Sequence, residues 1–302
     1  MYLTGFADEA ASAIDEQIRA TRELGWRNIE SRGIEGKNLT DIDDALFEQV
    51  CAKLAAAKVK VNCFGSAIAN WGKKIDEPFD SSLAEARRAI PRMQRLGSKL
   101  VRIMSFAVLP DRGPDDQMAE ERFRRLRELQ RMFSDAGLTP VHENCMNYGG
   151  MGWPYTLRMI ENVPGLKLVF DTGNPVFSDD RSKPVPHPKQ SAWEFYTHVK
   201  EHIAYVHIKD GRWDTATGKS VFTFPGEGDG DVPRIVKDLL DGGYDGGFSM
   251  EPHLAVVYHD ASITAPEAIR YANYVEYGHR FMKLVRQAGH GAKLDRSLRA
   301  AD

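Results

Sequence analysis

Four residues with metal-ligating side chains each follow a short apolar run of four or five residues: Glu143, Asp171, His207 and Glu251. Such runs are typical of buried strands. In a parallel α/β protein the carboxyl ends of the strands meet on one face, so we expect these side chains to gather there. Three carboxylates and one imidazole favour Mn²⁺ or Mg²⁺, while Co²⁺ or Zn²⁺ also fit. The sequence therefore predicts a site for one divalent cation, with Mn²⁺ as the first choice.

Each of these residues taken alone could be a solvated or salt-bridged side chain. That explanation is weaker for four of them placed after four consecutive strands. Cys145 lies two residues beyond Glu143, but a thiolate site would need more sulfur ligands. The predicted ligand set is therefore limited to the four residues.

Strand-like and helix-like runs alternate along the whole chain. The expected strands span 2–6, 28–32, 60–64, 100–105, 138–141, 166–170, 203–206 and 247–250, and the expected helices span 13–24, 45–57, 82–96, 120–136, 155–161, 193–201, 232–240 and 266–288. Eight such units predict an α/β protein that forms a single (β/α)8 TIM barrel. We expect a catalytic barrel over residues 1–290 and a polar tail over 291–302. A doubly wound sheet is the alternative, but no Gly-x-Gly-x-x-Gly follows the first strand.

Two of the loops that follow strands are longer than the rest. They span residues 177–190 and 210–231, and their position places both on the face where barrel enzymes keep their chemistry. The second loop contains glycines at 226, 228 and 230, interleaved with Glu227 and Asp229. Because acids repel phosphate, this stretch is interpreted as a turn or hinge.

The bulk composition excludes several classes of protein. Charged residues make up 27% of the 302 residues, with a net charge of −3, so a dedicated nucleic-acid binder is not expected. No apolar stretch approaches the roughly 20 residues that cross a membrane. The three cysteines lack CxxC spacing, and the N-terminus lacks the features of a signal peptide. We expect a reduced, cytoplasmic protein without structural disulfides.

Four short segments resemble the xylose-isomerase-like TIM-barrel superfamily, in particular its sugar phosphate isomerase/epimerase branch. They are His142-Glu143-Asn144, Asp171-Thr172-Gly173-Asn174, His207-Ile208-Lys209-Asp210 and Glu251-Pro252. The resemblance covers nearly the whole chain. It implies a TIM barrel in which one divalent ion is held by the four predicted ligands and a sugar is the substrate.

The implied activity is that of a metal-dependent sugar isomerase or epimerase. Such an enzyme abstracts a proton next to a sugar carbonyl through a metal-stabilised enediolate. A leaving group β to the carbanion would turn the same first step into elimination. The segment 142–153 is similar to the larger subunits of C-glycoside deglycosidases, which cleave 3-oxo-glucosides, so a lyase or deglycosidase is the alternative.

Two other functions are weighed against these enzymes. A non-catalytic metal-binding subunit is a minor alternative. Apurinic-site endonucleases share the barrel, but the histidines of their three-zinc cluster are missing from this chain.

Four residues are candidates for catalysis: Glu143, Glu251, His142 and Lys209. The resemblance suggests a ligand glutamate as the base. His142 could also be a base, yet strand alternation turns it away from its neighbour Glu143, so packing behind the site is an equal interpretation. Lys209 shares the parity of His207 and either places a cation beside a developing oxyanion or pairs with an acid.

Five residues are candidates for substrate binding: Glu30, Arg212, His253, Asn174 and Trp213. In relatives the residue matching Glu30 lies near the substrate, although a buried ion pair with Arg32 would also explain it. Asn174 stands where many relatives have His, a departure that points away from simple ketose epimerases. Arg212 could equally be a surface residue, and Trp213 could form a lid without touching the sugar.

The expected partner is a small-molecule sugar or sugar derivative, with no nucleic acid and no membrane. By analogy with other barrels we expect a homo-oligomer, and a small partner subunit stays open.

Overall fold

Eight parallel strands form the centre of the molecule in a computed structural model that describes residues 1–257 and 260–299. The strands are β1 (Tyr2–Gly5), β2 (Asn28–Ser31), β5 (Lys60–Phe64), β6 (Leu100–Ile103), β7 (Thr139–Glu143), β8 (Lys167–Asp171), β9 (Ile203–Ile208) and β12 (Gly247–Met250). Each pairs with its neighbour in chain order, and β12 returns to pair with β1. A parallel bridge from Phe6 to Glu30 joins the two ends of this order. The prediction of a single (β/α)8 TIM barrel is confirmed.

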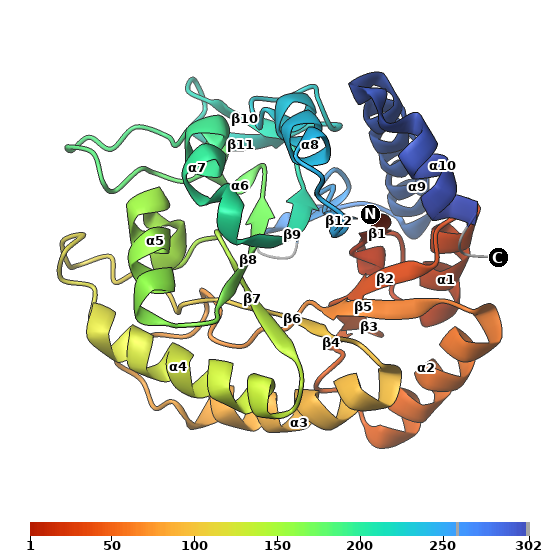
Figure 1. The fold of residues 1–302 in the computed structure, drawn as a ribbon, viewed down its shortest axis with the longest axis horizontal. Helices are drawn as coiled ribbons and strands as arrows, with labels where there is room; N and C mark the ends of the chain where they lie inside the picture. The colour runs from red at the N-terminus through yellow and green to blue at the C-terminus, as the bar shows by residue number, and fades with distance from the viewer. Residues whose placement is uncertain (258–259, 300–302) are drawn as a thin grey trace.

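Helices surround the strands (Figure 1). They are α1 (Ile14–Glu23), α2 (Asp44–Ala57), α3 (Asp80–Leu96), α4 (Ala119–Asp135), α5 (Trp153–Asn162), α6 (Asn174–Phe177), α7 (Ala192–Val199), α8 (Val232–Asp241), α9 (Glu267–Val285) and α10 (Gly291–Arg299). The segment expected to be a polar tail forms α10, because its Leu294 is fully buried. Residues 300–302 of that tail lie outside the described residues. Within the described part of the chain, no helix is both long and apolar enough to cross a membrane.

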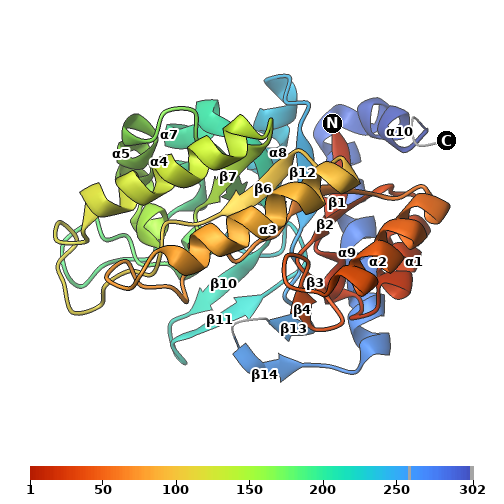
Figure 2. The same ribbon diagram turned by 90° about the horizontal axis from the view of Figure 1, so that it is seen from below.

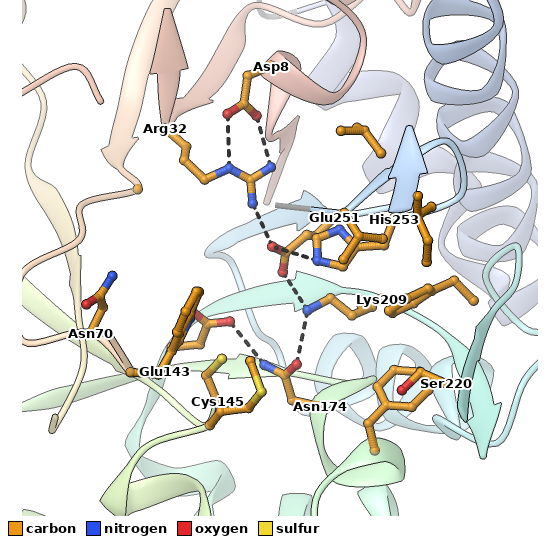
Figure 3. A pocket seen from close by; sticks show the side chains of 18 of the residues that line it. Asp8, Arg32, Asn70, Glu143, Cys145, Asn174, Lys209, Ser220, Glu251 and His253 are labelled. Atoms are coloured by element: carbon orange, nitrogen blue, oxygen red, sulfur yellow. Dashed lines mark hydrogen bonds and ion pairs between the residues drawn. The ribbon is translucent and has the colours of Figure 1, made fainter. Parts of the chain in front are cut away.

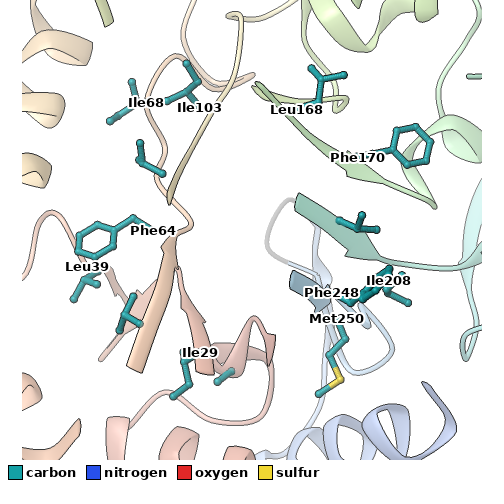
Figure 4. Close-up of a cluster of buried hydrophobic side chains, with 14 of the residues drawn as sticks. Ile29, Leu39, Phe64, Ile68, Ile103, Leu168, Phe170, Ile208, Phe248 and Met250 are labelled. Carbon is teal, nitrogen blue, oxygen red and sulfur yellow. The ribbon is translucent and has the colours of Figure 1, made fainter. Parts of the chain in front are cut away.

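Strand alternation divides the apolar side chains into two sets. Val141, Val169 and Tyr205 are buried together with Cys63 in a small cluster inside the barrel. Side chains of opposite parity, such as Phe170, pack in the larger core between strands and helices (Figure 4). The inner parity continues upward from Val141 to Glu143, from Val169 to Asp171 and from Tyr205 to His207. The alternation that fills the core therefore also aims these polar side chains into the barrel mouth.

Three short hairpins extend the loops at the end of the barrel where the strands finish (Figure 2). They are β3–β4 (Gly33–Ile34 and Lys37–Asn38), β10–β11 (Gly211–Asp214 and Lys219–Phe222) and β13–β14 (Val256–Val257 and Asp260–Thr264). Sequence reasoning treated these stretches as loops, because their strands either have only two residues or, as in β10–β11, carry no apolar run. The hairpins build the walls above the barrel mouth.

The loop after β6 is held by one buried guanidinium. Arg122 of α4 is fully buried and donates to the backbone carbonyls of Gln117 at 2.6 Å and Ala107 at 2.8 Å. It also donates to the carbonyls of Ser105 and Phe106. A charged donor that satisfies four carbonyls, three of them in buried bonds, is worth more than a neutral hydrogen bond. Arg122 therefore ties the start and the end of this loop to the helix behind it.

We predict that Arg122→Ala lowers the free energy of unfolding by about 2–4 kcal/mol, because buried carbonyls lose their charged donor. Urea denaturation followed by circular dichroism measures the change. Arg131→Ala on the same helix is the control, since the Arg131 side chain is 71% exposed, and it should change stability by less than about 0.5 kcal/mol. Equal effects of the two substitutions would contradict the role given to Arg122.

Candidate metal centre and active site

The structure brings the four predicted ligands into one buried cluster. Each of Glu143, Asp171, His207 and Glu251 offers one atom, and these atoms all lie within 4.8 Å of one another. The carboxylate oxygens nearest to His207 Nδ1 are Glu143 Oε1 at 3.5 Å, Glu251 Oε2 at 3.8 Å and Asp171 Oδ2 at 3.9 Å. Three acids and an imidazole this close are the donor set that a hard or borderline divalent cation requires.

Two of the ligands have their second polar atom fixed by hydrogen bonds. Asp171 Oδ1 accepts the backbone N–H groups of Gly173 at 2.8 Å and Asn174 at 2.7 Å. His207 Nε2 lies 3.0 Å from Glu30 Oε2. Carboxylate pairing of this kind orients a ligand imidazole and raises its basicity. Asp171 Oδ2 and His207 Nδ1 are therefore the atoms left to face the centre of the cluster.

The two glutamates follow the same scheme, with arginines as anchors. Arg102 Nη1 donates to Glu143 Oε2 at 3.1 Å, and Arg32 Nη1 donates to Glu251 Oε1 at 2.9 Å. Arg32 is itself held by a bidentate pair with Asp8 at 3.0 and 3.1 Å. Each glutamate therefore has one oxygen engaged by a guanidinium and the other directed toward His207.

The pKa values show how strongly these charges act on one another. Burial works against a charged His207, but Glu30 and Glu143 outweigh it and raise its pKa to about 10. Burial raises the pKa of Asp171 to about 6. Burial also opposes ionisation of Glu143, yet Arg102 and His207 lower its pKa to about 2. The cluster thus attracts positive charge, and a bound cation would take the place of the proton on His207.

The residues present fit a divalent cation. His207 Nδ1 is buried and has no hydrogen-bond partner among the described residues, so the atom that would bind a metal is left unused by the protein. The other ring nitrogen is already held by Glu30. A buried polar atom without a partner is costly unless a ligand satisfies it.

Lys209 and Asn174 complete the inner side of the cluster. Lys209 Nζ lies 2.8 Å from Glu251 Oε2, 3.1 Å from Asp171 Oδ2 and 3.0 Å from Asn174 Oδ1. Asn174 Nδ2 in turn donates to Glu143 Oε1 at 3.1 Å. Burial works against the Lys209 ammonium, but the surrounding carboxylates outweigh it and raise its pKa. Lys209 is therefore a fixed cation beside the candidate metal position.

A cavity of about 1020 Å³ opens above the cluster (Figure 3). Glu143 and Glu251 line it, whereas Asp171 and His207 lie beneath its surface. Three predicted substrate-binding residues, His253, Trp213 and Asn174, also line the cavity, together with Lys209.

His253 is fixed by an acid that sequence reasoning did not select. Its Nδ1 lies 2.9 Å from Glu9 Oε1, and its backbone N–H donates to Glu9 Oε2 at 2.8 Å. Glu9 belongs to a short 3-10 helix, Ala7–Glu9, that directly follows β1. The segment after the first barrel strand, β1, therefore helps to position a residue that follows the last barrel strand, β12.

Three predicted site residues lie elsewhere. Glu30 is fully buried behind His207 and does not line the cavity, so its place is that of an orienting group. His142 faces away from the barrel mouth, 3.0 Å from Ser105 Oγ, and burial lowers its pKa to about 4. Arg212 is exposed and donates to the backbone carbonyl of Glu227. Strand alternation explains His142 and Arg212, since each neighbours a residue that points inward.

Sequence reasoning did not select three further residues of the site: Arg32, Arg102 and Asp8. Parity supplies a signal for Arg32, which lies two residues after the inward-facing Glu30. Arg102 lies on the fourth barrel strand, β6, and is level with the inward-facing Val141. No spacing rule pairs either arginine with its glutamate, because the partners are 41 and 219 residues apart in the chain.

The glycine-rich stretch after β10–β11 wraps around one carboxylate. Asp210 accepts the backbone N–H groups of Gly226 at 2.7 Å, Gly228 at 3.1 Å and Gly230 at 2.9 Å, and that of Gly211 at 2.8 Å. A Cβ on Gly228 would lie 2.4 Å from Asp210 Oδ1. The expected turn is therefore an acid clamp, defined as Asp210 with these four N–H groups. It closes the loop that carries the hairpin.

Comparison with known proteins agrees with this geometry. The family model of the xylose isomerase-like TIM barrel matches residues 18–272, and the chain belongs to this family. No curated protein matches the sequence.

Solved structures share the fold at low sequence identity. A xylose isomerase-like TIM barrel protein from Mycobacterium smegmatis in complex with magnesium is 19% identical, with a TM-score of 0.66 over 95% of this chain and 97% of that one. D-allulose 3-epimerase from Methylomonas sp. in complex with D-allulose is 14% identical, with a TM-score of 0.63 over 95% and 97%. A probable 3-DHS dehydratase from Bacillus anthracis is 14% identical, with a TM-score of 0.64 over 91% and 97%.

We predict that Glu30→Gln weakens Mn²⁺ binding by about 10–100-fold, because the His207 imidazole loses its orienting carboxylate. Isothermal titration of the purified protein with MnCl₂ measures the affinity. Glu35→Gln serves as the control, since Glu35 is exposed and should leave the affinity unchanged. An unchanged affinity in Glu30→Gln would show that Glu30 does not act through the metal centre.

We predict that Asp210→Asn loosens residues 211–231 while the barrel stays folded. The amide oxygen cannot satisfy the N–H groups that the carboxylate holds, and loss of a charge-assisted bond should speed amide exchange in this loop at least about tenfold. Hydrogen–deuterium exchange with mass spectrometry reads the loop and the strands separately. Asp229→Asn, an exposed change in the same loop, should leave the exchange rates unchanged. Equal exchange rates in the two variants would contradict the role given to Asp210.

Proposed function

We propose that the chain is a divalent-metal-dependent enzyme that isomerises or epimerises a sugar or a sugar-derived small molecule. The reaction moves a proton at the carbon next to a carbonyl group. The observation that carries the proposal is the division of the ligands. Glu143 and Glu251 line the cavity, while Asp171 and His207 lie below it.

This division assigns different tasks to residues of one cluster. When bound, a divalent cation held by the four ligands would polarise the carbonyl oxygen of the substrate. Glu143 and Glu251 are the carboxylates within reach of a substrate, so they take and return the proton. Their outer oxygens are held by Arg102 and Arg32, which fixes the direction in which each glutamate can act.

Lys209 and His253 support the same reaction. The ammonium of Lys209 lies beside Glu251 and lines the cavity, so it stabilises negative charge that develops on a substrate oxygen. His253 Nε2 lies 3.7 Å from Glu251 Oε1 and is held from behind by Glu9. It is placed to bind a sugar hydroxyl next to the proposed base.

Elimination is the second candidate, because it begins with the same proton removal. One solved structure with this fold is described as a probable dehydratase. A substrate with a leaving group β to the abstracted proton would be cleaved by the same pair of glutamates. The outcome then depends on the substrate that the cavity admits.

We predict that Glu251→Gln loses most Mn²⁺ binding and nearly all solvent-proton exchange, because the change removes both a ligand charge and a proposed base. Incubation of ketoses and 3-oxo-glucosides in D₂O, with and without Mn²⁺, is followed by NMR. EDTA should stop the exchange in the unchanged protein, and added Mn²⁺ should restore it.

Glu120→Gln is the control, since the Glu120 side chain is 79% exposed on α4. Full metal occupancy with normal exchange in Glu251→Gln would overturn the proposal. Indifference of the exchange to EDTA would be equally damaging.

A further inference from the structure

The cavity above the metal centre has a polar floor and an apolar rim. The floor is formed by Glu143, Asn174, Lys209, Glu251 and His253. The rim includes six large apolar side chains, which stand among polar ones such as Asn70 and Lys219. They come from the segments after five strands: Trp71, Met104, Met146, Phe177, Trp213 and Phe222. A pocket that changes from charged to apolar in this way fits a ligand with the same two parts.

The size of the cavity sets a second condition. Its volume of about 1020 Å³ is at the upper end of the roughly 300–1,000 Å³ seen in pockets for drug-sized ligands. A single sugar ring is much smaller than such a ligand, so it would cover the floor and leave the rim in contact with water. Trp71 and Met146, at 38% and 45% exposure, are among the few exposed large apolar residues of the described chain.

The rim and the floor form one continuous surface. The ring of Phe222 packs edge-on against His253 with centroids 5.1 Å apart, and against Phe177 at 5.0 Å. His253 in turn reaches Glu251 at 3.7 Å. An apolar group on the rim is therefore close enough to be part of the same molecule as a sugar on the floor.

The rim is also held in shape before any ligand binds. Lys189 Nζ lies 3.7 Å from the ring centroid of Trp213 and donates to the carbonyl of Phe177 at 2.9 Å. The acid clamp at Asp210 closes the loop that carries Trp213 and Phe222. Flat rings that are fixed in advance bind a planar group at a low entropic cost.

We infer that the substrate is a sugar derivative that carries a planar apolar substituent, with the sugar on the floor and the substituent against the rim. The inference rests on the proposed function for the placement of the sugar. The rim assignment rests on the cavity alone. An aryl glycoside whose sugar ring carries a ketone is the simplest member of this chemical class, and a plain aryl glycoside is its unreactive analogue.

The test compares paired ligands that differ only in the substituent. Titration calorimetry with Mn²⁺ present measures the affinity of the 4-nitrophenyl and methyl glycosides of glucose, galactose and xylose. These glycosides lack the reacting carbonyl and serve as unreactive analogues. In at least one sugar, the aryl glycoside should bind about tenfold more tightly than its methyl partner. Lack of any aryl preference in all three pairs, including no binding at all, would overturn the inference.

Three tryptophan variants locate the effect. Trp213→Ala and Trp71→Ala should each lower the affinity for the aryl glycoside more than the affinity for its methyl partner, and so remove most of the aryl preference. Trp153→Ala is the matched control, because Trp153 stacks on His198 at 3.8 Å and does not line the cavity. An aryl preference that survives both rim changes, or that falls equally in the control, would place the binding elsewhere.

The experiment separates this inference from the proposed function. An aryl preference that needs Trp213, in an unchanged protein that shows no Mn²⁺-dependent proton exchange, would leave the rim in place and refute the chemistry. Mn²⁺-dependent proton exchange into sugars, together with equal binding of aryl and methyl glycosides, would support the proposed chemistry and refute the rim assignment.

Discussion

Each ligand of the candidate metal centre is held at its far end by a group of the protein. Backbone N–H groups hold Asp171, Glu30 holds His207, and two arginines hold the glutamates. Three carboxylates packed into a buried site repel one another, and burial alone disfavours their charged forms. The anchoring groups keep the acids in place and leave one atom of each pointing to a common centre. The direction of every other group in the site depends on this arrangement.

The barrel supplies the anchors through its register. Asp171 and His207 are directly paired between β8 and β9, so two ligands from separate strands lie side by side. Arg102 on β6 is level with Val141, two residues before Glu143 on β7. Side chains that alternate with a period of two point inward together when neighbouring strands share a register. The closed ring of strands thus brings together residues that are far apart in the chain.

The ligand set could be predicted from sequence because it repeats one local rule on four strands. Each candidate ligand follows an apolar run within two residues, and such runs are visible without a structure. The anchors Arg32 and Arg102 follow no such rule, since their partners are set by closure of the barrel. Glu30 was placed near the substrate by resemblance, whereas its contact with His207 puts it behind the metal centre.

The fold, like the site, could be predicted from the sequence only in part. The strand and helix periods of the sequence predicted the barrel and the positions of nearly all its strands and helices. Hairpin β10–β11 was missed because its strands, Gly211–Asp214 and Lys219–Phe222, carry no apolar run and are mostly outside the core. The helical form of residues 291–299 was also missed, since it depends on one buried leucine, Leu294, in a polar segment. Short elements are decided by tertiary contacts that a local period does not record.

The clamp at Asp210 recognises only the main chain of the loop that it closes. Its contacts are N–H groups of glycines, so the clamp itself uses no side chain of the hairpin. Arg212 adds one bond from its side chain to the backbone carbonyl of Glu227. Mutations of hairpin side chains leave the hydrogen bonds of the clamp unchanged. The hairpin is therefore a place where evolution or a protein engineer can change ligand preference while the clamp keeps the loop attached to the barrel.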